Sequence, residues 1–236
     1  MTHSLYKYPR LYINSAFKPS GSLQLDQGQA HYLKNVLRKV EGDAVRVFNG
    51  ADGEWLAQIS EMMKKSCAVR LVEQLKSQPE EAHECTLYFS PLKKDRMDFL
   101  IEKSVELGVT KLVPVLFNRS VIRKINPERI LAQIIAAAEQ CERMDLPELS
   151  ALCSFEDILH ECFFACVERL DACGAIHSYD LSGDVAFLIG PEGGVHDDEL
   201  LLLKGSKTVH LVSLGECVLR SETAAMACLS YVQLSK

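Results

Sequence analysis

Two glycine-rich runs near the C-terminal end constrain the fold of this chain most strongly. The first covers residues 189–194 (IGPEGG) and the second covers residues 214–225 (LGECVLRSETAA). Each follows a short apolar run typical of a β-strand, and each leads into a segment with a helical pattern. Glycine-rich turns at the carboxyl ends of neighbouring strands are where open α/β sheets bind small ligands. The two runs therefore predict an α/β fold with a ligand site formed by both turns.

The spacing of these glycines argues against two common ligand classes. Neither run contains G-x-G-x-x-G, the pattern of dinucleotide-binding turns, and neither contains G-x-x-x-x-G-K-[ST], the pattern of P-loops. Chemistry alone leaves a second interpretation open, in which both runs are ordinary turns between a strand and a helix.

The order of elements predicts two domains, the first over residues 1–76. Strand-like segments and one helix, about residues 27–37, fill this part, and the Asn-Gly-Ala-Asp-Gly run at residues 49–53 is a hairpin signal. We therefore expect a small domain like a β-barrel, followed by a polar linker at residues 77–81. The expected strands are residues 10–13, 44–48, 55–59 and 67–74.

The second predicted domain covers residues 80–236, where strand and helix patterns alternate. This alternation predicts an open parallel sheet covered by helices. The expected strands are residues 87–89, 112–116, 185–189 and 209–212. The expected helices are residues 95–107, 127–140, 154–170, 197–203 and 221–234.

The composition fits an ordinary globular protein, with 47% apolar and 25% charged residues. No apolar stretch approaches the roughly 20 residues of a membrane span, and the first residues lack a signal-peptide pattern, so we expect a cytoplasmic protein. The nine cysteines are most simply reduced thiols. We expect no metal, because the spacing of the candidate ligands matches no common zinc pattern. These candidates are His160, Cys162, Cys166, Cys173 and His177.

Four stretches of the chain carry a family resemblance. They are residues 31–43 (HYLKNVLRKVEGD), 93–108 (KKDRMDFLIEKSVELG), 136–143 (AAAEQCER) and the two glycine-rich runs. Together they resemble the SPOUT methyltransferases, whose C-terminal trefoil knot binds S-adenosylmethionine, and within that class the family that methylates N3 of a uridine in 16S ribosomal RNA. The departures are small: Ser221 stands where threonine is expected, and Cys141 and Glu142 stand where Ser-Gly is common.

The resemblance implies a PUA-like RNA-binding fold for the first domain and a knotted methyltransferase fold for the second. It also implies a homodimer and S-adenosylmethionine as the cofactor, bound by the two turns. Glycine suits such turns because a Cβ would hold the adenine away from the backbone. For Leu211, Leu214, Val218 and Leu219 the alternative role is core packing. For Glu192 it is capping of the helix that follows. The expected cofactor contacts are Ile189, Gly190, Pro191, Glu192, Gly193, Gly194, Leu211, Leu214, Gly215, Val218 and Leu219.

Arg220 and Glu222 are the expected catalytic residues. Methylation at N3 requires the uridine imide to lose its proton, and the resulting anion spreads onto carbonyl oxygens that a guanidinium can bind. We therefore expect Arg220 to stabilise this anion, with Glu222 or a bound water taking the proton. A salt bridge between the two side chains is the structural alternative.

Charge is distributed unevenly along the chain. Residues 1–76 hold 11 Lys and Arg against 7 Asp and Glu, whereas the remainder holds 15 against 25. Within the acidic remainder, residues 93–124 hold 8 basic against 4 acidic residues. This distribution suits an enzyme that contacts a polyanion on one side only. Each basic residue taken alone is more often a solvated surface charge. The expected contacts with 16S rRNA phosphates are Arg10, Lys34, Arg38, Lys93, Lys94, Arg96, Arg119, Arg123 and Arg143.

Two rival functions stay open from the sequence. One is a SPOUT enzyme that methylates another RNA position, such as a ribose 2′-oxygen. The other is a non-catalytic ribosome-assembly factor that uses its first domain to bind RNA, against which the intact glycines of both turns argue.

Overall fold

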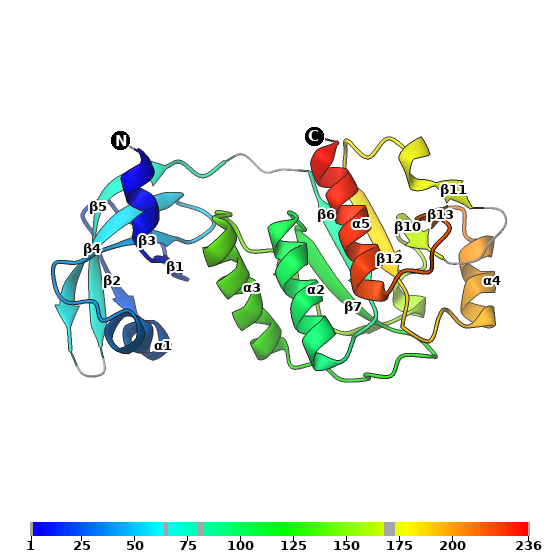
Figure 1. Cartoon of the computed structure of the whole chain (residues 1–236), viewed down its shortest axis with the longest axis horizontal. Helices are drawn as coiled ribbons and strands as arrows, with labels where there is room; N and C mark the ends of the chain where they lie inside the picture. Colours follow the sequence, from blue (N-terminus) through cyan, green and yellow to red (C-terminus); the bar gives the residue numbers. More distant parts are fainter. Residues whose placement is uncertain (1, 64–65, 80–82, 168–172, 236) are drawn as a thin grey trace. The chain divides into compact units, whose positions relative to one another are not determined.

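A computed structural model describes residues 2–63, 66–79, 83–167 and 173–235 of the chain. It divides into two compact units (Figure 1). The first comprises residues 1–81 together with 138–145, and the second comprises residues 82–137 and 146–236. No helix of the described ranges has both the length and the apolar character needed to cross a membrane.

The first unit is built on a five-stranded mixed sheet in the order β1-β3-β4-β5-β2. β1 and β3 are parallel and the other neighbours are antiparallel, with β3 and β4 joined by the predicted hairpin turn. The strands are β1 (Arg10–Tyr12), β2 (Ser22–Leu25), β3 (Ala44–Phe48), β4 (Glu54–Met62) and β5 (Cys67–Lys76). Alternating apolar residues bury one face of this sheet, as Val45, Val47 and Ile59 show. The sequence prediction missed β2. The domain that we expected to resemble a barrel is a mixed sheet, and β1 and β2 are its edge strands in the described residues.

The predicted helix at residues 27–37 is also present in the first unit. It consists of α1 (Gln27–His31), continued by one π-helical segment, η2 (Tyr32–Val36), and a 3₁₀ segment, η1 (Thr2–Lys7), lies at the start of the chain. The Asp26 side chain accepts a hydrogen bond from the Gln29 amide at 2.8 Å, and Gln29 accepts one in return from the Asp26 amide. This reciprocal capping box fixes where α1 begins.

The second unit contains an eight-stranded sheet in which every described pair is parallel. The order is β11-β13-β10-β12-β6-β7-β8, and β9 also pairs with β7. The strands are β6 (Cys85–Phe89), β7 (Lys111–Leu116), β8 (Glu148–Leu149), β9 (Cys153–Ser154), β10 (Phe163–Cys166), β11 (Gly174–Ala175), β12 (Val185–Ile189) and β13 (Val209–Ser213). The predicted α/β class with a parallel sheet is confirmed, and the knot implied by the resemblance stays a prediction.

Helices cover this sheet, with α5 packed against both α2 and β12 (Figure 1). They are α2 (Lys94–Glu106), α3 (Pro127–Cys141), α4 (Asp197–Gly205) and α5 (Ser221–Leu234), with two short 3₁₀ turns, η3 (Glu156–Ile158) and η4 (Ile176–Ser178). The central strand β12 is apolar along its whole length, as expected for a strand covered on both faces.

The predicted helix over residues 154–170 is wrong where the structure describes it. η3 forms one turn there, and residues 163–166 form β10 between β12 and β13. Phe163 and Ala165 are buried while Phe164 and Cys166 are half-buried, which is the two-residue alternation of a strand. Pairing with strands on both sides therefore overrides the helix-like pattern. Residues 168–170 of the prediction lie outside the described residues.

Candidate active site

The two glycine-rich turns line one cavity in the second unit. The first turn follows β12 and the second follows β13, and the carboxyl end of β10 lies between them. Because all three strands are parallel, their carboxyl ends meet at the same edge of the sheet. The cavity has a volume of about 920 Å³, within the range of pockets for small ligands.

Ten of the eleven expected cofactor contacts line this cavity, and Leu211 does not. Leu211 is half-buried and packs against the core cluster of the sheet, which is the alternative role considered for it. The sequence prediction missed Cys166 and Val167 at the end of β10, because it placed them on a helix. The short apolar run at residues 163–167 fits a buried strand as well as a helix, so it does not decide between them.

The first turn is held by contacts from several directions. The Ser221 hydroxyl donates to the Gly190 carbonyl at 3.0 Å, and the Gly194 amide donates to the Pro191 carbonyl at 2.9 Å. Arg119 donates to the carbonyls of Gly193 and Val195 at 3.4 and 3.3 Å. These contacts fix the turn before any ligand binds.

Glycine is required in the first turn at two positions. A Cβ on Gly190 would lie 2.9 Å from Cγ2 of Val195, and Gly194 has a φ of +74° that other residues rarely adopt. Both glycines line the cavity, so a ligand can approach the backbone closely at these two positions. Glycine spacing and cavity size thus fit a nucleoside-like cofactor such as S-adenosylmethionine.

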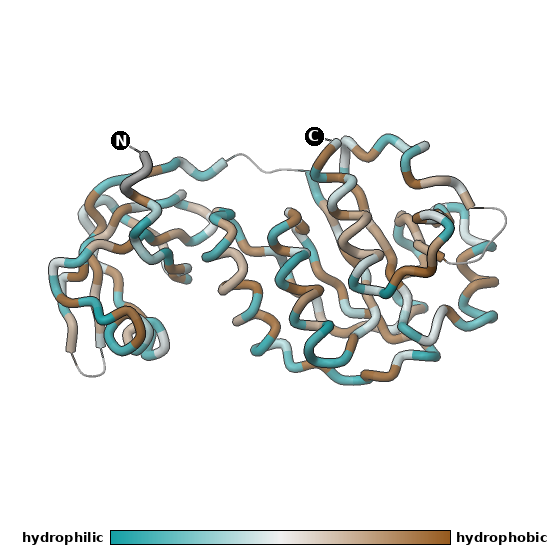
Figure 2. Tube along the Cα trace, viewed as in Figure 1, coloured by the Kyte–Doolittle hydropathy of each residue, from teal (hydrophilic) through white to brown (hydrophobic). Residues whose placement is uncertain are grey.

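The second turn carries Arg220 into the wall of the cavity. Arg220 is exposed and precedes the first residue of α5, without a side-chain capping bond to that helix. The chain leading into α5 is rich in hydrophobic residues (Figure 2), and Val218 is 55% exposed there. The structural alternative for Arg220 was a salt bridge with Glu222, but Glu222 pairs with Arg96, with 3.7 Å between Nε and Oε1.

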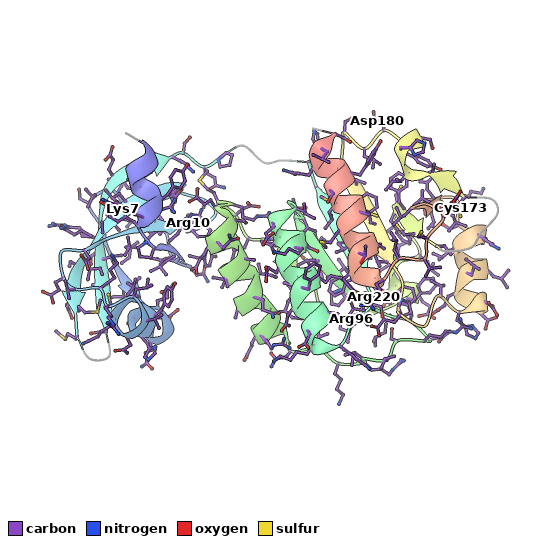
Figure 3. All side chains as sticks on the ribbon, in the orientation of Figure 1. Lys7, Arg10, Arg96, Cys173, Asp180 and Arg220 are labelled. Carbon is purple, nitrogen blue, oxygen red and sulfur yellow. The ribbon has the colours of Figure 1, made fainter. Side chains whose placement is uncertain are left out.

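Glu222 lies in the first turn of α5 and is buried, with 9% of its surface exposed. It is not among the residues that line the cavity, and its Oε2 atom is buried without a hydrogen-bond partner. Arg96 does line the cavity, and it also pairs with Glu192 of the first turn. Figure 3 shows Arg96 and Arg220 near the adjacent ends of α2 and α5.

The structure contradicts two of the expected phosphate contacts, Arg10 and Arg143. Arg10 is 6% exposed and donates to Glu54 Oε1 at 3.0 Å and to the carbonyls of Ala138 and Arg143 at 2.8 Å each. Burial lowers the pKa of Arg10, against the opposing charge of Glu54. Arg143 pairs with Asp145 at 2.6 Å, and 13% of its side chain is exposed. Both side chains stabilise the first unit, where their donors are occupied.

A buried charge network in the first unit explains these placements. Arg46 pairs with Glu54 at 3.2 Å and with Glu142 at 2.8 Å, and the Tyr12 amide donates to Glu139 at 2.9 Å. Burial raises the pKa of Glu139, although the Tyr12 amide opposes this. The network holds residues 138–145 against the sheet, and the AAAEQCER stretch therefore has a packing role here.

The remaining basic residues are placed as follows. Lys93 and Lys94 are exposed at the start of α2, and Arg123 is exposed and donates to the Phe117 carbonyl at 3.4 Å. Lys34 and Arg38 border a separate, shallow cavity of about 570 Å³ in the first unit.

Neither metal ligation nor disulfide bonding contributes to the described structure. Across residues 2–63, 66–79, 83–167 and 173–235, no three His, Cys, Asp or Glu side chains come together in a metal-binding group. The cysteines in these ranges form no disulfide bond. Cys166 and Cys228 place their sulfurs 3.4 Å apart, and this contact together with burial raises the pKa of Cys228. The Cys228 thiol therefore stays protonated and packs as an apolar group.

Comparison with known proteins identifies the family. A family model described as an RNA methyltransferase domain matches residues 79–233, and one described as an RNA methyltransferase PUA domain matches residues 25–72. The Rickettsia conorii ribosomal RNA small subunit methyltransferase E is 36% identical over 235 residues, which is 97% of this chain and 96% of that protein. The chain belongs to this methyltransferase family.

Other members of the methyltransferase family agree with this assignment. The Synechocystis ribosomal RNA small subunit methyltransferase E is 31% identical over 222 residues, covering 89% of this chain and 72% of that protein. A Neisseria gonorrhoeae ribosomal RNA small subunit methyltransferase E, solved bound to S-adenosyl methionine, has a TM-score of 0.86 at 26% identity, covering 96% and 97% of the two chains. A Legionella pneumophila methyltransferase solved with bound SAM has the same TM-score at 31% identity, covering 97% and 98%. The family predicted from the sequence is confirmed.

Proposed function

We propose that this chain transfers a methyl group from S-adenosylmethionine to N3 of a uridine in 16S ribosomal RNA of the small subunit. The single observation that carries the proposal is the cavity shared by both glycine-rich turns, with Arg220 in its wall, in a chain of this family. Relatives solved with the cofactor support it as the methyl donor.

The residues of this chain have separate roles in the proposed reaction. Backbone groups of the two turns hold the adenine and ribose, and apolar side chains such as Leu214 and Leu219 exclude water. The Arg220 guanidinium binds the carbonyl oxygens of the uridine beside N3 and stabilises the anion formed there. The N3 proton passes to the Glu222 carboxylate through a bound water, because Glu222 itself does not line the cavity.

The proposed step balances in protons and electrons. S-adenosylmethionine supplies an electrophilic methyl carbon on a sulfonium, and the electron pair of the breaking carbon–sulfur bond remains on sulfur. The N3 lone pair of the uridine anion forms the new bond, so the methylated base is neutral. The protein's contribution is alignment, water exclusion and removal of one proton.

A methylation assay tests the proposal. Small ribosomal subunits from a strain lacking the gene, incubated with the chain and labelled S-adenosylmethionine, are expected to gain one methyl group, which nuclease digestion and mass spectrometry place on a uracil base. A label on a ribose oxygen would instead support the rival SPOUT activity. Absence of both methylation and S-adenosylmethionine binding, measured by calorimetry, would support the non-catalytic assembly factor.

We further propose that the first unit contacts RNA phosphates through Lys34, Arg38 and Lys39, which border its shallow cavity. Exposed cations fix a protein on a nucleic acid without reading its sequence. Replacing Lys34 and Arg38 by alanine should weaken binding of small-subunit RNA. The slope of log affinity against log salt should become shallower by about 0.7–0.9 for each phosphate that the variant no longer neutralises. Unchanged binding and slope would exclude this surface.

The proposal includes a cytoplasmic homodimer. Leu201 and Leu202 on α4 expose 66% and 48% of their surface, and Leu200 next to them lines the cavity. A second copy covering this apolar surface beside the site would explain the exposure. Analytical ultracentrifugation tests the dimer, and a monomer at micromolar concentration would contradict it.

A further inference from the structure

Arg96 connects the two glycine-rich turns through two carboxylates. It lies in the first turn of α2, its Nη1 donates to Glu192 Oε1 in the first turn of the site, and its Nε lies 3.7 Å from Oε1 of Glu222. The three side chains come from three separate elements: α2, the turn after β12, and the start of α5. Arg96 also lines the cavity itself.

The two carboxylates differ in their surroundings. The Glu192 side chain is 25% exposed, and an ion pair at such a site contributes little free energy. The Glu222 side chain is 11% exposed, and its second oxygen is buried without a hydrogen-bond partner. A buried carboxylate without a cation is costly, so the pairing with Arg96 matters most for Glu222.

The other charged groups near Glu222 do not replace Arg96. α5 packs against α2 and β12, and β12 has no ionisable side chain. On α2, Lys94 and Asp95 are exposed, and Asp98 pairs with Arg129. On its own segment, Arg220 is exposed in the cavity wall. Within the described parts of the chain, Arg96 is the cation paired with Glu222.

We propose that Arg96 is a positioning residue that fixes the Glu222 carboxylate and ties the turn containing Glu192 to the start of α5. This proposal rests on the proposed uridine methylation and deepens it. It also replaces the expectation that Arg96 contacts an RNA phosphate, because both carboxylates occupy its guanidinium. Arg96 itself touches no reacting atom in this scheme.

The split between turnover and cofactor affinity distinguishes this role from a structural one. Single-turnover methylation of small subunits at saturating S-adenosylmethionine and calorimetric affinity for S-adenosylmethionine are measured for the wild type, Arg96→Gln, Arg96→Lys and Glu222→Gln. Without its ion pair, Glu222 is no longer held in place, so turnover of Arg96→Gln should fall roughly tenfold. The affinity should fall only about threefold, through the lost tie to Glu192. Arg96→Lys should restore most of the turnover.

Matched variants isolate the effect. Asp95→Asn removes an exposed charge from the same turn of α2 and should leave turnover and affinity unchanged. Glu222→Gln should lower turnover by roughly 10²-fold or more. The Arg96→Gln and Glu222→Gln double variant should be no slower than Glu222→Gln alone, since residues that act through one another are not additive.

Glu192→Gln provides a second route if Arg96→Gln does not fold. It removes the tie to the first turn while the Arg96 and Glu222 pair remains, so S-adenosylmethionine affinity should fall about threefold and turnover should fall less than in Arg96→Gln. Wild-type turnover in a folded Arg96→Gln, additive losses in the double variant, or a loss of turnover in Glu192→Gln as large as that of Arg96→Gln would each overturn the proposal. A wild type that methylates no small-subunit RNA would instead refute the proposed function.

Discussion

The two glycine-rich turns line the same cavity but are held very differently. The first turn receives hydrogen bonds from Ser221 and Arg119 and an ion pair from Arg96. Up to the start of α5, the second turn has a local contact, in which Ser213 and Gly215 bond each other at 3.3 Å, and residues 215–218 are exposed. One turn is therefore fixed by the rest of the unit, whereas the other is open to solvent.

This difference separates binding from chemistry. The fixed turn offers a preformed surface, which lowers the entropic cost of binding a cofactor. The open turn carries Arg220 in the wall of the cavity, and α5 begins immediately after it. We infer that cofactor affinity depends mainly on the first turn and turnover mainly on the second.

The largest expected effect is on turnover, from Arg220→Ala. Loss of one group that stabilises a developing anion typically slows a reaction by about 10²- to 10³-fold. The affinity for S-adenosylmethionine should stay close to that of the wild type, because Arg220 makes no capping bond to α5 whose loss would disturb the turn. Single-turnover rates and calorimetry measure the two quantities on the same protein.

Lys207→Ala is the control for this prediction, because Lys207 is exposed and lies outside the cavity lining. It should change neither quantity. Equal losses of rate and affinity in Arg220→Ala would contradict the inference that affinity depends mainly on the first turn and turnover mainly on the second.

The second prediction concerns affinity and the first turn. Gly190→Ala places a methyl group 2.9 Å from Cγ2 of Val195, a β-branched side chain that has little freedom to move. The turn must shift, and the affinity for S-adenosylmethionine should fall about tenfold, or ~1.4 kcal/mol. Calorimetric titration measures the loss.

Gly183→Ala is the matched control, since Gly183 precedes the same strand and has open space around it. Its affinity should equal that of the wild type. If Gly190→Ala bound the cofactor normally while its turnover fell, the first turn would determine turnover rather than cofactor affinity, and the inference would be wrong.

Both turns can be predicted from the sequence, because glycine and apolar runs carry local information. The patterns at residues 185–189 and 221–234 predict the observed bounds of β12 and α5, since an uninterrupted apolar run and a helical pattern each match one element. The element between the two turns cannot be predicted in the same way. Residues 163–166 form a strand because β12 and β13 pair with it on either side, and no local pattern records that pairing.

The role of a side chain can likewise be predicted only where it depends on the local sequence. The cavity residues follow from their position in the two runs, whereas the roles of Arg10 and Arg96 depend on carboxylates 44 and 126 positions away along the chain, Glu54 and Glu222. A basic residue in a sequence indicates a charge without indicating its partner. The structure therefore corrects the predicted phosphate contacts Arg10 and Arg96, whose guanidinium groups pair with distant carboxylates.

The smallest predicted effect tests how much the anchors of the first turn contribute. Arg119→Ala removes two long hydrogen bonds, at 3.3 and 3.4 Å, from an exposed side chain to the carbonyls of Gly193 and Val195. Solvent replaces such bonds readily, so the affinity for S-adenosylmethionine should fall only about threefold, or ~0.7 kcal/mol. Turnover at saturating cofactor should stay unchanged. A loss as large as that of Gly190→Ala would mean that Arg119, rather than the packing around the glycines, fixes the turn.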